Sequence, residues 1–316
     1  MLVSQSACAK LILLGEHAVV YGFPALAIPF SSLRVRASVE PDFTSAPGTL
    51  TVIAPEKEAQ RLKNPEAVSD LIEKACEMTL RTLNLTQAPT CVVRVRSEIP
   101  FASGLGSSAA VSVAVARALS AFLGHPLPVE EVNAVAFQTE QLTHGSPSGI
   151  DNTVIAYEQP IFFQKTQTPM GVHPGKTFTF LVADSGVQKS TMETVSRLAQ
   201  RRTDSPQEVE PVLTQIGLLA QPGLQALEEG DEARLGSLMN QNQTLLSSLG
   251  LSCEALDRLI EAALSAGAIG AKLTGGGQGG HMLALVPESA VSPVKSALSA
   301  AGSPHVYLTT LKPAEG

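Results

Sequence analysis

Residues 100–110 read PFASGLGSSAA, a run of small residues that contains two glycines. It follows an extended apolar run, Cys91–Val95, and leads into a segment whose spacing predicts a helix from about Ala109 to Leu123. Amides at the start of a helix lack intrahelical partners and carry partial positive charge, so an anion is stabilised there. We therefore predict a phosphate-binding loop that leads into a helix.

Gly104 and Gly106 permit positive φ and close approach to the backbone, while the serines can cap the helix or offer hydroxyls to phosphate or a metal ion. The residues expected to bind a phosphate-bearing cofactor are Pro100, Ser103, Gly104, Leu105, Gly106, Ser107, Ser108 and Ala109. Residues 104–109 also satisfy the GxGxxG/A pattern of dinucleotide-binding folds, which is weak by itself. A glycine turn before a packed helix is the purely structural alternative.

Composition narrows the class of protein. The chain has 316 residues, a length that allows one large or two ordinary domains with a real core. Of these residues 44% are hydrophobic and 16% are charged, which is typical of a globular protein. A net charge of -7 and the scarcity of Lys/Arg clusters argue against a nucleic-acid partner. We expect a small-molecule substrate instead.

Two further features bear on location. The four cysteines contain no CxxC pair, so neither a zinc site nor a disulfide framework is indicated, and a reducing cytosol fits. The apolar run Leu11–Leu14 is too short for a signal peptide, and the helix expected at 109–123 is shorter than the roughly 20 apolar residues that span a bilayer. We expect a cytoplasmic protein without a membrane partner.

Hydrophobic periodicity outlines the elements. A short strand precedes a turn at 14–17, and further strands are predicted at 33–39, 91–95, 178–182 and 281–286. Helices are predicted at 65–83, 109–123, 129–142, 190–199, 209–227, 233–249, 254–264 and 290–301. This order indicates an α+β sandwich in each half rather than a regular βαβ wind. A linker at about 169–174 divides the chain into domains 1–170 and 171–316.

Glu140 lies on the apolar stripe of its helix, four residues after Ala136 and eight after Val132. A buried carboxylate needs a cation, hydrogen bonds or a basic side chain. A magnesium ligand and a structural ion pair are therefore both open interpretations.

Asp151 follows a loop of glycine, serine and proline and begins another short segment. Its carboxylate could converge with that of Glu140 on one pocket and take a proton from a substrate hydroxyl, as Asp does in many phosphoryl-transfer sites. A helix cap or an Asx turn is the commoner structural alternative.

Lys10 precedes the first apolar run, where it is either a solvated charge or a group that stabilises a transferring phosphoryl group electrostatically. His17 is either a turn or core histidine or a polar contact to substrate. The glycine cluster in 272–280, KLTGGGQGG, is either a flexible hairpin or backbone that passes close to the phosphate loop. The Walker-like run 171–177 has the wrong spacing and precedes a strand, so we give it no role.

Three blocks in this order resemble the GHMP small-molecule kinases. They are AKLILLGEHAVVYG at 9–22, PFASGLGSSAA at 100–110 and KLTGGGQGG at 272–280. The sequences GEHAVVYG at 15–22 and HGSPSGIDN at 144–152 are most similar to the branch of the family that phosphorylates mevalonate. The resemblance extends through most of the chain.

The resemblance implies two α+β domains, the first like domain 2 of ribosomal protein S5, with the active site in the cleft. It implies ATP phosphates over residues 104–109 and Mg²⁺ on Glu140 and a loop serine, Ser107 or Ser108. Asp151 matches the base that activates the C5 hydroxyl of mevalonate, and Lys10 matches the lysine that assists it. Glu16 and His17 fall in the block that helps to form the substrate pocket. The product would be 5-phosphomevalonate, an isoprenoid precursor.

The third block departs from the family pattern GAGGGGC. Gly276, Gln278 and His281 stand where the family has alanine, glycine and cysteine. These changes leave the local nucleotide or substrate contacts open.

Three alternatives remain at this stage. The chain could be another GHMP kinase acting on phosphomevalonate, homoserine or a sugar. A dinucleotide-dependent oxidoreductase would need an acidic residue about 20 positions past the loop, and the stretch LGHPLP at 123–128 has none. A catalytically dead sensor would not need the base. The sequence does not specify an oligomeric state, and a homodimer is allowed.

Overall fold

The computed structural model describes residues 1–54, 65–100, 103–145 and 147–313. Phe101 and Ala102 of the predicted phosphate loop, and Ser146 of the HGSPSGIDN block, lie outside these residues. The chain divides into two compact units, each assembled from separate stretches. The first unit comprises Met1–Ala9, Leu33–Phe101 and Gly106–Glu158. The second unit comprises Lys10–Ser32, Ala102–Leu105 and Gln159–Gly316. The domain boundary expected at residue 170 stays a prediction.

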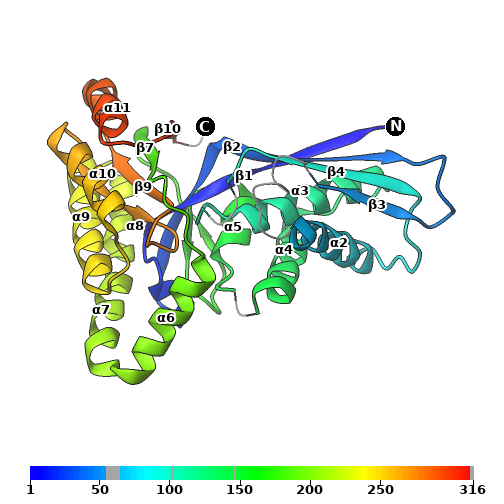
Figure 1. Ribbon diagram of the computed structural model, residues 1–316, viewed down its shortest axis with the longest axis horizontal. Helices are drawn as coiled ribbons and strands as arrows, with labels where there is room; N and C mark the ends of the chain where they lie inside the picture. The colour runs from blue at the N-terminus through cyan, green and yellow to red at the C-terminus, as the bar shows by residue number, and fades with distance from the viewer. Residues whose placement is uncertain (55–64, 101–102, 146, 314–316) are drawn as a thin grey trace. The chain divides into compact units, whose positions relative to one another are not determined.

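The first unit combines antiparallel and parallel strand pairs with a group of helices (Figure 1). Its elements are β3 (Leu50–Ile53), α2 (Pro65–Thr82), β4 (Cys91–Ser97), α3 (Ser107–Phe122), α4 (Val129–His144) and α5 (Ile150–Tyr157), with parts of β1 (Val3–Leu14) and β2 (Ala25–Pro41). Residues 35–41 of β2 pair antiparallel with β4, and β3 pairs parallel with β4. Figure 1 shows the four helices together on one side of β3 and β4.

Small residues explain how α3 occupies the middle of this helix group. Most of α3 is buried, and its alanines, serines and valines leave room for α2, α4 and α5 to pack around it. In β4 the burial alternates, and Arg94 and Arg96 are exposed. The predicted phosphate loop therefore leads into a densely packed helix.

The second unit contains an antiparallel sheet in the order β10-β7-β9-β8. Its strands and short helices are η1 (Ala18–Tyr21), β5 (Ile161–Phe163), β6 (Met170–Gly171), β7 (Phe178–Asp184), β8 (Gly270–Thr274), β9 (His281–Leu285), η2 (Glu288–Ala290) and β10 (Val306–Leu311). Its longer helices are α6 (Thr191–Asp204), α7 (Pro206–Leu218), α8 (Ala220–Glu229), α9 (Glu232–Ser248), α10 (Glu254–Ser265) and α11 (Val291–Ala300). Residues from both sheet and helices form one buried apolar core.

Most predicted helices are present within a few residues of their expected ends, but one prediction was wrong. The periodic run 209–227 is divided between α7 and α8 at Leu219. Pro222 lacks the N–H that would bond the Leu218 carbonyl, so this hydrogen bond is missing where the helix divides, whereas α7 continues through Pro211 nearer its start. The edge strand β10 and the short strands β3, β5, β6 and β8 were not predicted. Of the helices the structure describes, none combines the length and apolar character needed to cross a membrane.

Candidate functional site

The phosphate loop passes from the second unit to the first between Leu105 and Gly106. Gly104 and Gly106 both have φ of 77°, as predicted for backbone that L side chains rarely adopt. Gly106 caps α3 in the left-handed conformation, and no side chain of the cap accepts a hydrogen bond from the helix. As a glycine, Gly106 has no side chain of its own that could occupy the first-turn amides of α3.

Three candidate residues of the first unit lie on packed helices. Ser107 is buried at the start of α3, and its Oγ has no hydrogen-bond partner among the described residues. Ser108 follows and is half-buried. Glu140 on α4 is 7% exposed, which confirms that its side chain is on the inward face. A buried hydroxyl and a buried carboxylate are oxygen donors of the kind that Mg²⁺ prefers.

Asp151 lies in the first turn of α5, directly after Gly149 and Ile150. Gly149 has φ of 94° and forms the left-handed cap that turns the chain into the helix. Asp151 is half-buried, and its negative charge is favoured there by the positive end of the helix dipole. The sequence placed it correctly at the start of a short segment.

In the second unit, β1 brings Lys10 against the phosphate loop. Lys10 is 2% exposed, so the interpretation as a solvated charge was wrong. Its Nζ donates a hydrogen bond to the Gly104 carbonyl at 2.9 Å, and its backbone N–H donates to the Leu105 carbonyl at 3.0 Å. An ammonium group is thereby held at the loop that was predicted to bind phosphate.

The glycine turn, defined here as residues 275–280 between β8 and β9, also packs against this loop. A Cβ added to Gly275 would lie 2.7 Å from the carbonyl oxygen of Gly104. At the end of the turn, the Nδ1 atom of the buried His281 lies 3.3 Å from the carbonyl oxygen of Ser103. The predicted close approach of the two glycine-rich segments is confirmed.

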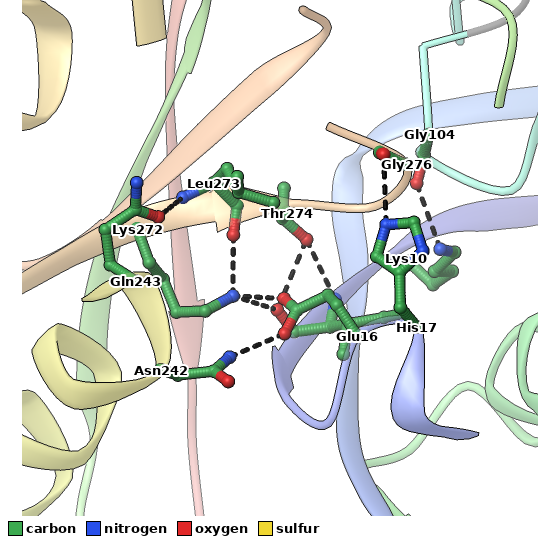
Figure 2. Close-up of polar contacts among 11 residues, drawn as sticks. Lys10, Glu16, His17, Gly104, Asn242, Gln243, Lys272, Leu273, Thr274 and Gly276 are labelled. Carbon is green, nitrogen blue, oxygen red and sulfur yellow. Dashed lines mark hydrogen bonds and ion pairs between the residues drawn. The ribbon is translucent and has the colours of Figure 1, made fainter. Parts of the chain in front are cut away.

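Glu16 forms the centre of a buried polar network (Figure 2). Its carboxylate is fully buried and ion-paired with Lys272 Nζ, and it accepts a hydrogen bond of 2.7 Å from Asn242 Nδ2. Lys272 also donates to the Leu273 carbonyl at 2.6 Å, and burial lowers its pKa while Glu16 acts to raise it. The network connects the GEHAVVYG block to β8 and α9.

His17 is the neighbour of Glu16 and contacts the glycine turn. Its Nε2 lies 3.0 Å from the Gly276 carbonyl oxygen. A carbonyl can only accept, so Nε2 carries the proton and Nδ1 carries the lone pair. Burial lowers the pKa of His17 to about 4, which keeps the ring neutral near pH 7. His17 also has φ of 62°, and such a conformation persists only where surrounding contacts hold it.

Sequence reasoning missed Asn242 and Gln243 of α9 and the ion pair of Lys272. Gln243 accepts a hydrogen bond of 2.9 Å from the Leu273 N–H, next to Lys272. A signal was available in α9, because Asn242 falls on the same helical stripe as the buried Leu235, Leu238 and Met239. A polar residue on such a stripe needs a polar partner, although its identity cannot be read locally.

Comparison with known proteins places this geometry in a family. The family model for the GHMP kinases N terminal domain matches residues 70–159, and the model for the GHMP kinases C terminal matches residues 224–304. The chain is 35% identical to mevalonate kinase of Pyrococcus abyssi over 96% of this chain and 95% of the relative. It is 37% identical to mevalonate kinase of Thermococcus gammatolerans over 96% of this chain and 94% of the relative.

Solved structures agree with the sequence relatives. The crystal structure of L. major mevalonate kinase in complex with R-mevalonate superposes with a TM-score of 0.82 at 28% identity, covering 99% of this chain and 97% of that chain. The Methanococcus jannaschii mevalonate kinase has a TM-score of 0.81 at 24% identity, with 100% and 98% coverage, which supports the fold. The predicted α+β two-domain fold is confirmed. From the sequence relatives and the two family models together, we conclude that the chain belongs to the GHMP kinase family.

Proposed function

We propose that this protein phosphorylates the C5 hydroxyl of mevalonate with ATP, giving 5-phosphomevalonate for isoprenoid precursor synthesis. The observation that carries the proposal is the near full-length similarity to mevalonate kinases at 35–37% identity. The similar L. major structure holds R-mevalonate. The chain has a lysine at the predicted phosphate loop, a buried carboxylate on α4 and an aspartate at the start of α5.

Two residues would carry the chemistry. Asp151 would accept the proton of the substrate hydroxyl as that oxygen forms its bond to the γ-phosphorus of ATP, while the bond to the β-phosphate oxygen breaks and ADP leaves. The ammonium of Lys10 would stabilise the negative charge of the transferring group, from a position fixed by its hydrogen bond to Gly104. Glu16 and His17 would help to shape the substrate pocket, which stays a prediction.

The residues present fit a nucleotide and a magnesium ion. The N-cap residue of α3 is Gly106, which has no side chain to occupy the first amides, and the buried Ser107 hydroxyl has no partner among the described residues. Ser107 or Ser108, together with Glu140, would hold Mg²⁺, which when bound neutralises charge on the phosphates. No group of three metal-ligating His, Cys, Asp or Glu side chains is present in the described parts of the chain. Mg²⁺ in kinase sites needs only one or two carboxylates beside substrate phosphates and water.

A substrate screen tests the proposal. Purified protein with Mg-ATP is assayed for ADP release with mevalonate, phosphomevalonate, homoserine and galactose. We expect turnover with mevalonate in clear preference to the other three. Preference for another substrate would contradict the substrate assignment, and ATP binding without turnover of any of them would favour a sensor. A cytoplasmic location and a homodimer stay predictions.

A further inference from the structure

Gln278 interrupts the glycine turn in an unfavourable backbone conformation. Its φ is 60°, in the left-handed region, and its neighbours Gly277 and Gly279 also have positive φ. Glycine adopts this conformation without a steric penalty, whereas a residue with a Cβ pays for it. A glutamine here therefore persists only because other contacts hold it.

The contacts that hold Gln278 come from one loop. Its side-chain Nε2 donates hydrogen bonds to the Gly250 carbonyl at 2.5 Å and to the Ser252 carbonyl at 2.7 Å. Its backbone N–H donates to the Leu251 carbonyl at 2.7 Å. Residues 250–252 connect α9 to α10, so three hydrogen bonds from a single residue attach the turn to this connection.

The same turn contacts the candidate site. The Gly276 carbonyl accepts the hydrogen bond that sets the tautomer of His17, and Gly275 packs against Gly104 of the phosphate loop. A Cβ on Gly280 would lie 2.9 Å from the Ser103 carbonyl oxygen. The turn thus lies between the 250–252 connection and the segments that carry His17 and the phosphate loop.

The connection itself is braced by α9. Gln243 donates through Nε2 to the Ser252 hydroxyl at 3.3 Å and accepts through Oε1 from the Leu273 N–H at 2.9 Å. The side-chain amide of Gln243 therefore bonds the connection through its nitrogen and β8 through its oxygen. The carbonyls that accept hydrogen bonds from Gln278 therefore belong to a connection that is itself hydrogen-bonded to α9.

We propose that Gln278 is a positioning residue that fixes the glycine turn, and through it the Gly276 carbonyl and the Gly104 backbone, for substrate and nucleotide binding. The inference rests on the proposed function for its kinetic consequence. Glycine at this position would remove the backbone penalty but also both side-chain hydrogen bonds. Of the three hydrogen bonds to the connection, the turn would then keep only the one from the backbone N–H of residue 278 to the Leu251 carbonyl, while its close packing against Gly104 remained possible.

Three variants separate positioning from stability. Gln278→Gly removes both side-chain hydrogen bonds and the backbone strain together, while Gln278→Glu keeps the size but places carboxylate oxygens against two carbonyls. Thr166→Gly is the matched control, because Thr166 also has positive φ, at 72°, but lies on an exposed turn between β5 and β6. Unfolding temperature, kcat, and KM for ATP and mevalonate are measured for each variant.

We expect both Gln278 variants to lower kcat/KM by about tenfold, mainly through KM, because a displaced turn weakens binding of the substrates in the ground state and the transition state alike. The unfolding temperature of Gln278→Gly should stay near that of the wild type, since relieved strain offsets part of the lost hydrogen bonding. Thr166→Gly should leave kcat/KM unchanged. Unchanged kcat/KM in the Gln278 variants, or an equal fall in Thr166→Gly, would overturn the proposal.

A spectroscopic readout separates this inference from the proposed function. The ¹⁵N chemical shifts of the His17 ring report which nitrogen is protonated. We expect protonated Nε2 in the wild type and a mixture of tautomers in Gln278→Gly. If the wild type fails to turn over mevalonate while this difference is present, the proposed function fails and the positioning role stands. An identical His17 spectrum in both proteins would overturn the positioning role.

Discussion

At the scale of single residues, Asp151 tests the proposed chemistry. Asp151→Asn keeps the size of the side chain but removes the basic oxygen, so kcat should fall by about 10²–10⁴-fold, the range for one general base. Binding of Mg-ATP should change little, because the side chain is expected to act on the hydroxyl substrate. Steady-state kinetics and the shift in unfolding temperature caused by Mg-ATP measure the two effects.

Asp151→Asn also removes a charge from the first turn of α5, which is worth about 0.3–1 kcal/mol of stability. A variant that loses only this stability and keeps wild-type kcat would show that the residue serves the helix alone. Lys10→Met is tested by the same two measurements, steady-state kinetics and the shift in unfolding temperature caused by Mg-ATP. This variant should lower kcat far more than it weakens ATP binding.

The buried imidazole of His17 predicts a pH effect on stability. Burial lowers its pKa from 6.5 to about 4, so the folded protein keeps the ring neutral where the unfolded chain takes up a proton. The stabilisation is fully present above pH 6.5 and is lost as pH falls from 6.5 to about 4, up to about 3 kcal/mol for a shift of this size.

Urea unfolding at pH 7 and pH 4.5 measures this effect in the wild type and in His17→Asn. Asparagine tolerates positive φ, so the backbone is preserved. The variant should lose less stability than the wild type on acidification. His125 is exposed, and His125→Asn is the control that should behave like the wild type. Equal losses in all three proteins would contradict the role assigned to burial of His17.

How much of the site could be predicted depends on the range of each contact. The inward face of Glu140 follows from helical spacing, and the approach of the two glycine-rich segments follows from their composition. The ion pair of Glu16 with Lys272 joins residues 256 positions apart, and the bond to Asn242 spans 226. Local periodicity carries no information about such partners, so these contacts came only from the structure.

At the scale of elements, the attachment of β8 to the GEHAVVYG block depends on the buried ion pair. Lys272→Met leaves the Glu16 carboxylate buried without its cation, and loss of one partner of such a pair typically costs about 3–5 kcal/mol. Adding Glu16→Gln should recover part of the loss, because a neutral amide costs less to bury. Urea unfolding of the single and double variants measures both effects.

The ion pair between the exposed Lys176 and the half-buried Glu232 is the comparison. Lys176→Met should cost at most about 1 kcal/mol, as is usual for surface ion pairs. A cost for Lys272→Met as small as that of Lys176→Met would contradict the buried network.

Contact between the phosphate loop and the glycine turn gives a second prediction for elements. A Cβ at Gly275 would meet the Gly104 backbone, whereas a Cβ at Gly22 would meet nothing within 4 Å, and both glycines have positive φ. Gly275→Ala should therefore lower kcat/KM by about 10²-fold through displaced backbone. Gly22→Ala should show only the backbone penalty in unfolding measurements. Equal kinetic effects would contradict the close approach.

Helices with a sustained apolar periodicity were predicted best, because that signal lies within the helix's own sequence. Helices α2, α3, α4, α9 and α10 follow their apolar spacing closely. The division of α7 from α8 falls beside Pro222, which lacks an N–H, but α7 also contains Pro211, so neither apolar spacing nor proline positions locate the division from the sequence. Short strands such as β5 and β6 are defined by their pairing partners, and such pairing is invisible in a window of a few residues.

At the scale of the whole molecule, each compact unit is built from stretches far apart in the chain. The second unit takes residues 10–32 and 102–105 in addition to the C-terminal half. A change in composition along the chain does not show that such distant stretches pack together. The order of the three glycine-containing blocks nevertheless predicted the family correctly, because their spacing along the chain is a property of the sequence alone.

The central claim is transfer of the γ-phosphoryl group of ATP to the C5 hydroxyl of mevalonate. Following the reaction of Mg-ATP and mevalonate by ³¹P NMR tests it most directly, since the product's phosphorus couples to the protons of the carbon that bears it. We predict a phosphate monoester signal coupled to the C5 methylene protons, growing at the rate at which ADP appears. Appearance of ADP with inorganic phosphate only, or no reaction while homoserine or phosphomevalonate is phosphorylated, would contradict the account.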